Sequence, residues 1–268
     1  MDLPDERLDK ARAAYKEKDI RATKEAHSPE NIQNPSEPHR IGSGAYIGEA
    51  VYGALDGIVT TFAVVAGVAG AKLPSHVVLI LGFANLIGDG LSMGVGSYLS
   101  TKSKREYQDS ERTREIWEIE NYPDGEIEEV REIYRRKGFK GDDLEQAVKV
   151  ITSNKDVWIK TMMYEELGIV PESGHPFFNG LSTFLAFAIA GLIPLLFFVL
   201  ARALPSLTPY SFPLSITLTA VMLFVIGSLK VIVTRTTWWK SGFEMLIVGG
   251  LTAVGAYTVG YLLQGLAR

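Results

Sequence analysis

Five long apolar runs constrain the fold of this chain more than any other feature of its sequence. A membrane-spanning helix needs about 20 mainly apolar residues, because the hydrocarbon core of a bilayer is about 30 Å thick. Helices of this length in soluble proteins carry a polar face, which these runs mostly lack. We therefore predict an all-α membrane protein with five transmembrane helices, at 46–70, 77–99, 179–203, 212–233 and 243–264.

The charged residues lie mainly outside these runs. Of the 31 acidic residues, 9 lie in 1–44 and 18 in 103–172. Cys is absent, which excludes disulfides and thiolate metal sites. We expect four parts: a polar N-terminal tail, two transmembrane helices, an acidic helical metal-binding domain and three further transmembrane helices, at 1–44, 45–100, 101–175 and 176–268. The third part, 101–175, is called the insert below.

Lysine and arginine in the loops predict the orientation. The tail holds 8 of them and the stretch 103–172 holds 12, whereas the opposite side has few. The positive-inside rule then places the N-terminus and the insert in the cytosol and the C-terminus on the opposite side. The membrane would be the cell inner membrane in a bacterium or an organelle membrane in a eukaryote. No basic stripe with interleaved aromatics is present, so we expect no nucleic-acid partner.

The insert is predicted to fold as three helices between the second and third spans. They cover roughly 100–121, 125–138 and 142–168, and the first can continue the second span without a break. The sequence Asn121-Tyr-Pro-Asp-Gly is a strong stop signal for the first helix. The third helix can kink near Ser153-Asn154.

Acidic residues inside the first two spans suggest a path for a cation. Ionisable groups at bilayer depth are costly and usually functional. Glu49 and Asp56 are seven residues apart and share a helix face. Carboxylates offer hard oxygen ligands and Met a softer one, a combination that suits a transition metal. The alternative is that these groups are hydrogen-bonded packing residues. In the second span polar or thioether groups recur at every fourth position, at Asn85, Asp89, Met93 and Ser97.

Two pairs of glycines have the spacing that lets membrane helices approach closely. They are Gly53 with Gly57 in the first span, and Gly90 with Gly94 in the second. The close approach can occur between helices of one chain or across a two-fold axis. The second possibility would give a homodimer.

Acids and methionines of the insert fall on shared helix faces, which lets three helices bring them into one cluster. Such a cluster repels itself without cations, which favours bound metal. The alternative is a solvated helical stalk with salt bridges, because 12 basic residues accompany the 18 acids. The sequence has no EF-hand loop and no Glu-x-x-His pair of the di-iron type. The residues concerned include Glu111, Glu115, Glu118, Glu126, Glu129, Met162, Met163, Glu165 and Glu166.

Four stretches resemble the vacuolar iron transporter family, and the similarity covers roughly 45–268. They are YGALDGIVTTFAVVAG at 52–67, ANLIGDGLSMGVGSYLS at 84–100, EEVREIYRRKGF at 128–139 and WIKTMMYEELG at 158–168. The resemblance implies a dimeric, proton-coupled transporter that moves Fe2+, and also Mn2+, out of the cytosol. Zn2+ and Co2+ are further candidate substrates, and we expect a bacterial-type member.

The resemblance also assigns roles to residues. The family's membrane metal residues match Asp56 and Met93, to which we add Asp89 and Glu49 as pathway residues. The chain departs from the family pattern at Ser97, where many relatives carry Glu, and at Asp89, where they lack an acid. The family's metal-binding glutamates and methionines outside the membrane match Glu115, Glu118, Glu126, Glu129, Met162, Met163 and Glu166.

Two other functions compete with proton-coupled transport. A membrane-anchored protein for iron storage or sensing would need the insert but no acids in the spans. A ferroxidase would need histidine ligands, and the four histidines are scattered. We therefore expect a transporter and not an enzyme.

Overall fold

The computed structural model describes residues 13–26, 41–170, 174–229 and 237–267. The chain divides into two compact units, Met1–Gly44 and Ala45–Arg268. In the first unit, helix α2 (Ile20–Ala26) begins where the Asp19 carboxylate accepts hydrogen bonds from the backbone N–H groups of Arg21 and Ala22, at 2.8 and 3.1 Å. An acid in this position satisfies N–H groups that the first helical turn leaves free.

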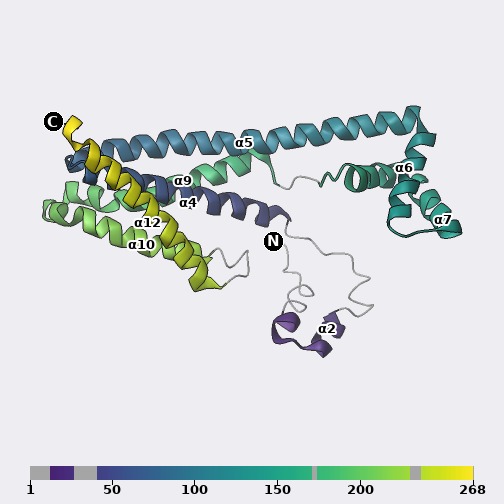
Figure 1. The fold of residues 1–268 in the computed structure, drawn as a ribbon, viewed down its shortest axis with the longest axis horizontal. Coiled ribbons are helices and arrows are strands. Elements are labelled where there is room, and N and C mark those ends of the chain that lie inside the picture. The colour runs from purple at the N-terminus through teal and green to yellow at the C-terminus, as the bar shows by residue number, and fades with distance from the viewer. Residues whose placement is uncertain (1–12, 27–40, 171–173, 230–236, 268) are drawn as a thin grey trace. The chain divides into compact units, whose positions relative to one another are not determined.

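The described residues of the second unit form helices joined by turns and short loops, without strands (Figure 1). Five of its helices are long and apolar enough to cross a membrane, which confirms the predicted number of spans. The chain is therefore an integral membrane protein. These helices are α4 (Ile41–Gly70), α5 (Ser75–Asn121), α9 (Pro176–Ala203), α10 (Ser211–Leu229) and α12 (Trp238–Leu263). The short 3-10 turns η2 (Pro205–Tyr210) and η3 (Gln264–Ala267) precede α10 and follow α12.

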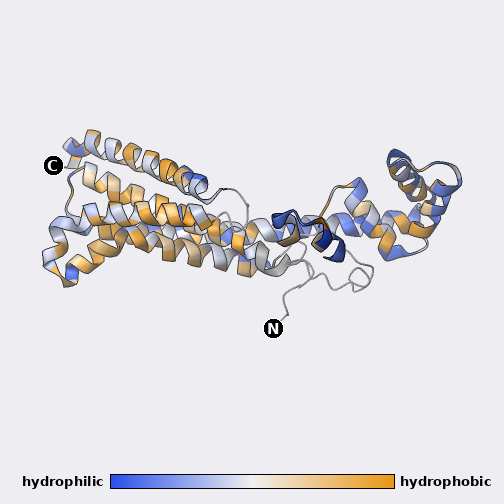
Figure 2. Ribbon diagram, turned by 90° about the horizontal axis from the view of Figure 1, so that it is seen from below, coloured by the Kyte–Doolittle hydropathy of each residue, from blue (hydrophilic) through white to orange (hydrophobic). Residues whose placement is uncertain are grey.

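Helix α5 is much longer than one membrane span. Its 47 residues extend about 70 Å at 1.5 Å per residue. The apolar first half forms the second span, and the second half continues into the insert without a break. The ribbon coloured by hydropathy shows this change along the helix (Figure 2). The second span and the first helix of the insert are thus one element.

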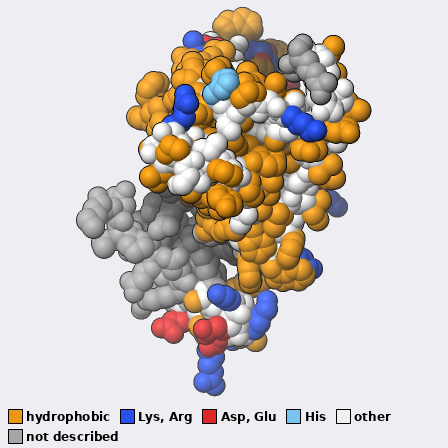
Figure 3. Space-filling view, turned by 90° about the vertical axis from the view of Figure 1, so that its left-hand side faces the viewer, with side chains coloured by type: hydrophobic (Ala, Val, Ile, Leu, Met, Phe, Trp, Pro, Cys, Tyr) orange, Lys and Arg blue, Asp and Glu red, His pale blue; other side chains and the backbone are white. Residues whose placement is uncertain are grey.

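Helix α9 packs against both α5 and α10. A buried apolar cluster joins α4, α5 and α9, and its members include Phe62, Val65, Leu86, Phe187 and Leu195. Many large apolar side chains on the outer faces of the spans remain exposed, as expected of surfaces that face lipid. Figure 3 shows one end of the molecule, where hydrophobic side chains dominate the coloured surface.

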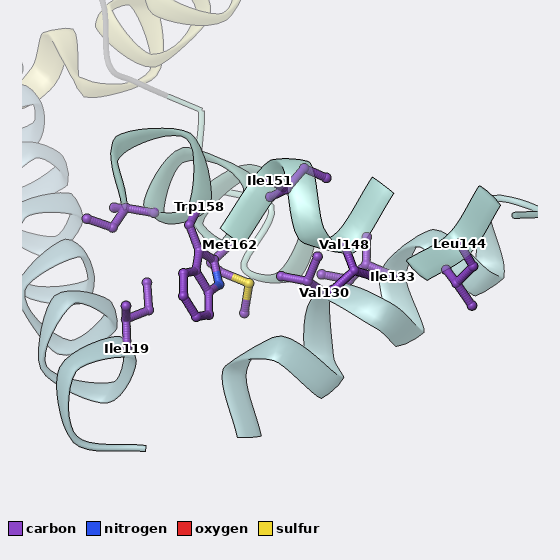
Figure 4. Close-up of a cluster of buried hydrophobic side chains, with 9 residues drawn as sticks. Ile119, Val130, Ile133, Leu144, Val148, Ile151, Trp158 and Met162 are labelled. Atoms are coloured by element: carbon purple, nitrogen blue, oxygen red, sulfur yellow. The ribbon is translucent and has the colours of Figure 1, made fainter. Parts of the chain in front are cut away.

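The insert contains α6 (Pro123–Arg136), α7 (Gly141–Thr152), α8 (Lys155–Thr161) and a π-helical turn, η1 (Met162–Glu166). The predicted third helix is therefore divided. The division occurs because Asn154 accepts hydrogen bonds from the backbone of Asp156 and Val157, at 3.0 and 3.2 Å, and so starts a new helix. An apolar core built from these helices and the end of α5 holds the insert together (Figure 4), and it comprises Ile119, Val130, Ile133, Leu144, Val148, Ile151, Trp158, Ile159 and Met162.

Several described helices begin before the predicted span, by five residues for both α4 and α12. The last span begins at Trp238 rather than at 243, because Trp238 and Trp239 form the first turn of α12 instead of preceding it. Helix α10 is described as far as Leu229, and the predicted residues 230–233 lie outside the described residues.

Candidate functional site

Glu49 lies where α4 meets α5 and α9. Its Oε2 accepts a hydrogen bond from Ser97 Oγ at 2.9 Å and another from Thr183 Oγ1 at 3.1 Å. The side chain is half-buried. Three helices thus meet around one carboxylate, and both hydrogen bonds come from neutral hydroxyl groups.

Thr183 and its neighbour Asn179 were missed by the sequence reasoning, which considered polar and thioether groups only in the first two spans. Both are buried on α9. Asn179 Nδ2 donates to Thr101 Oγ1 on α5 at 2.9 Å, whereas its Oδ1 is buried with no hydrogen-bond partner among the described residues. Their spacing of four residues in an otherwise apolar span was the available signal.

Asp56 and Asp89 lie one turn or more deeper along α4 and α5. They are close enough for their charges to interact, and Asp56 is half-buried whereas Asp89 is exposed. Close to them, Asn85 Nδ2 donates to Thr60 Oγ1 at 3.4 Å, and Thr60 Oγ1 donates to the backbone carbonyl of Asp56 at 2.8 Å. The structure therefore brings these two predicted pathway acids together across the α4–α5 contact.

Met93, the fourth predicted pathway residue, is half-buried and packs against the apolar cluster that joins α4, α5 and α9. It shares the α5 face with Asp89 and Ser97 through the four-residue spacing. Its contacts are those of a packing residue, and its role as a metal ligand stays a prediction.

The glycine pairs serve contacts within the chain. A Cβ at Gly53 or Gly57 would collide with the backbone carbonyl of Thr183 or Phe187 on α9. A Cβ at Gly94 would lie 3.0 Å from the carbonyl of Gly180, also on α9. Of the two alternatives for this spacing, the structure shows the first. These glycines let α4 and α5 approach α9, so they no longer support a dimer.

The glutamates predicted to bind metal come together in the insert. Glu115 is only 1% exposed, and neither of its carboxylate oxygens has a hydrogen-bond partner in the described part of the chain. Glu126 is 6% exposed, and its Oε2 is buried and equally unpartnered there. Buried carboxylates without hydrogen bonds are costly and need an explanation, such as an ion.

Charge repulsion links these carboxylates across three segments. Burial, then repulsion from Glu129, Glu115, Glu118 and Glu166, raises the pKa of Glu126 to about 7. Much of Glu166 is open to solvent, yet partial burial of its carboxyl and repulsion, first from Glu129, raise its pKa to about 7 as well. The end of α5, α6 and η1 therefore present their acids to one shared region.

Met162 and Met163, the two methionines predicted to bind metal, differ in how deeply they are buried. Met162 is fully buried in the core of the insert beside Trp158 (Figure 4), whereas Met163 is half-buried at its edge. Both belong to the π-helical turn η1, together with Glu166. Single π-turns inside helices are rare and frequent at functional sites. Sequence periodicity gave no sign of this turn.

The carboxylates of the insert approach one another without closing around a common point. Within the described ranges, no group of three or more His, Asp or Glu side chains is close enough to hold a metal ion. The glutamates repel one another at longer range, and Arg114 contacts Glu115 and Glu118. Shared coordination of an ion by these residues requires side-chain rotations. Their assignment as ligands stays a prediction.

Comparisons with known proteins agree with the resemblance seen in the sequence. The model of the VIT family matches residues 47–261. The chain is 38% identical to a vacuolar iron transporter of Toxoplasma gondii, over 96% of this chain and 88% of the relative. For a vacuolar iron transporter of Plasmodium falciparum the identity is 33%, over 95% of both chains.

Vacuolar iron transporter 1 of Oryza sativa is 32% identical, over 83% of this chain and 87% of the relative. These relatives give no support to the expectation of a bacterial-type member. The family match and the identity together extend across all five spans and the insert. The chain therefore belongs to the VIT family.

Proposed function

We propose that this protein transports Fe2+, and also Mn2+, out of the cytosol in exchange for protons. The observation that carries the proposal is the position of two polar regions along one helix. Helix α5 bears Asp89 and Ser97 in its apolar half and Glu115, buried and unpartnered among the described residues, in its second half. The relatives named vacuolar iron transporter support iron as the substrate.

The membrane part of the route runs between α4 and α5. Glu49, Asp56, Asp89 and Met93 would pass the ion across, in a hard-oxygen and soft-sulfur environment that suits Fe2+ and Mn2+ and also admits Co2+ or Zn2+. A carboxylate must lose its proton before it binds a metal ion. Protons that move against the metal would then reset Asp56 and Glu49, which gives a physical basis for antiport.

The insert would collect metal on the cytosolic side. Its ligands would be the glutamates of α5, α6 and η1 with the two methionines of η1. The positive-inside distribution of Lys and Arg supports a cytosolic N-terminus and insert, with the C-terminus on the opposite side. The organelle membrane or cell inner membrane that holds the protein would then separate cytosolic metal from the compartment that receives it.

A homodimer would complete the membrane part. Asp89 is exposed on the single chain, and an ionisable group at bilayer depth is costly when it faces lipid. The positions beside it at Gly88 and Gly96 have open space around them. A second copy placed against this face of α5 would cover Asp89 and close the route.

The test is flux in proteoliposomes that contain the full chain. With an inwardly directed Mn2+ or anaerobic Fe2+ gradient and an opposing pH gradient, we expect metal uptake that slows when the pH gradient is collapsed. Uptake independent of the pH gradient would contradict proton coupling. Metal binding without any uptake would favour the storage or sensing alternative, and oxidation of Fe2+ by the protein would favour an enzyme.

A further inference from the structure

Arg114 holds two of the predicted metal ligands in the insert. Its Nη2 lies 3.0 Å from Glu115 Oε1, and its Nη1 donates to Glu118 Oε2 at 2.7 Å. The contact with Glu115 lacks hydrogen-bond geometry, since neither Glu115 oxygen has a hydrogen-bond partner among the residues that the structure describes. The guanidinium therefore supplies charge to the buried carboxylate without satisfying its oxygens.

The same guanidinium has a third partner outside the predicted ligand set. Arg114 Nε donates to Glu111 Oε2 at 3.0 Å, one turn earlier on α5. Glu111 is half-buried and faces the same side of the helix. Arg114 thus has a partner that it can keep if Glu115 and Glu118 turn away toward an ion.

We infer that Arg114 is a tethered counter-ion, which occupies the acidic cluster before metal arrives and is displaced onto Glu111 when metal binds. The inference rests on the proposed function, because it takes the cluster as a metal site. Two positive groups cannot share the Glu115 and Glu118 carboxylates at close range without repulsion. A divalent ion carries twice the charge of the guanidinium and can be shared by more carboxylates, so it wins the competition once enough of them converge.

The fold offers a matched control in Arg131 on α6. Arg131 also joins several carboxylates: its Nε lies 2.9 Å from Glu145 Oε1, and its Nη1 pairs with Glu128. Neither acid is a predicted metal ligand. Arg131 therefore pairs with exposed glutamates outside the predicted site, whereas Arg114 pairs with predicted ligands, one of which is buried.

The experiment is titration of the full-length protein in detergent micelles with Mn2+ at pH 8. The part of the binding that belongs to the insert is the part lost in Glu126→Gln. An opposite charge within about 4–6 Å changes the proton affinity of a carboxylate by about one to three tenfold steps. We expect Arg114 to weaken Mn2+ binding by an amount at the lower end of this range. Arg114→Gln should therefore lower the Kd for Mn2+ about tenfold.

Three further variants test whether Arg114 opposes or supports Mn2+ binding. Glu111→Gln should weaken Mn2+ binding several-fold, because Arg114 loses its alternative partner and stays on Glu115 and Glu118. Arg114→Lys should return the Kd toward that of the unaltered chain, and Arg131→Gln should leave it unchanged. In the presence of a chelator, Arg114→Gln should lower the melting temperature of the insert, which shows its metal-free role directly.

A lower Kd in Arg114→Gln together with a higher Kd in Glu111→Gln would support the inference, even if one of the two variants is also less stable. An unchanged or raised Kd in folded Arg114→Gln would overturn it, because Arg114 would then support the bound state. If the unaltered chain binds no Mn2+ in the insert, the proposed function fails at this site and the inference fails with it. The two failures are distinguished by whether the unaltered chain binds.

Discussion

Glu49 in the membrane bundle and Glu115 in the insert are both removed from water to some degree, but the fold compensates their charges in different ways. Glu49 receives hydrogen bonds from two neutral hydroxyls, those of Ser97 and Thr183. Glu115 has no hydrogen bond among the described residues and relies on the charge of Arg114. Hydroxyl donors leave the negative charge of Glu49 available to an ion, whereas an ion must compete with a resident cation at Glu115.

The difference suggests that the two regions act at different steps. A carboxylate compensated by neutral groups suits brief contact with an ion in transit. A buried cluster with its own counter-ion suits selection and retention of an ion before transit. The following experiments separate the two regions, from the largest expected effect to the smallest.

Asp56→Asn should stop transport and leave the insert intact. The amide keeps the shape of the side chain but cannot carry the negative charge or the exchanged proton. Mn2+ uptake by proteoliposomes should fall to background, while Mn2+ binding by the insert stays unchanged. Glu244→Gln, which removes the acid of α12, is the control and should retain uptake. Uptake by Asp56→Asn within twofold of the unaltered chain would remove Asp56 from the route.

Glu126→Gln should weaken Mn2+ binding by the insert more than it reduces transport. Loss of a ligand should raise the Kd for Mn2+ at least about tenfold, since even residues that only support metal ligands cost 10–100-fold when replaced. Uptake at saturating metal should fall much less, because the membrane route is intact. Glu128→Gln, on the Arg131 side of α6, should bind as before. Equal losses of uptake and binding would show that the two regions cannot be separated.

Gly57→Ala should destabilise the bundle and not the insert. The new Cβ meets the backbone carbonyl of Phe187, which cannot move as a flexible side chain could. We expect a cost of about 1–3 kcal/mol, as for other overpacked sites. Gly48→Ala has nothing within 4 Å of the new Cβ and should be neutral or slightly stabilising. Thermal unfolding in detergent, followed by size-exclusion chromatography, measures both.

Stability of the metal-free insert should fall as pH rises. The pKa of Glu126 and that of Glu166 lie at about 7 in the folded chain, above the ordinary 4.5. Between about 4.5 and 7 the folded state therefore holds more protons than the unfolded state, and the free energy of unfolding decreases with pH. Fluorescence of Trp158, buried in the insert core, reports the transition. A saturating metal should remove the pH dependence, and an opposite slope would contradict the assigned pKa shifts.

Met162→Leu should have the smallest effect on stability. Leu has nearly the volume of Met, so the core should lose less than about 1.5 kcal/mol. Comparison with Met163→Leu then tests which sulfur meets the ion. If only Met163→Leu weakens Mn2+ binding, Met162 is a packing residue, and loss in Met162→Leu would instead show that the core opens on binding.

Much of the fold could be predicted from the sequence. The five spans follow from composition over some 20 residues, a signal that no local contact can reverse. The stop at Asn121-Tyr-Pro-Asp-Gly was equally local, and the structure ends α5 at Asn121. The break at Asn154 was harder, because Asn inside a helical pattern either kinks or caps, and only its hydrogen bonds to Asp156 and Val157 decide between them.

The candidate site was predictable in its acids and not in their partners. Spacing placed Glu115 and Glu118 on one face of α5, and the structure brings their charges close to those of Glu126, Glu129 and Glu166. The role of Thr183 depends on a contact with Glu49, which is far away in the sequence. The role of Arg114 depends on which of several nearby acids it contacts. Helical periodicity carries neither kind of information. The π-turn η1 was also out of reach, because it depends on one extra residue in a single turn.

The unbroken second half of α5 has a mechanical consequence. No Gly or Pro interrupts the helix from Ser97 to Asn121, whereas five glycines lie between Ser75 and Gly96. The stretch from Ser97 to Glu115 is about 27 Å long at 1.5 Å per residue and behaves as a stiff lever. A tilt of about 10° at Ser97 would displace Glu115 by roughly 5 Å over that length. Any rotation of α5 that opens the route at Glu49 is thus amplified at the acidic cluster, and the distance between spin labels placed near Glu49 on α4 and near Glu115 on α5 would change with it.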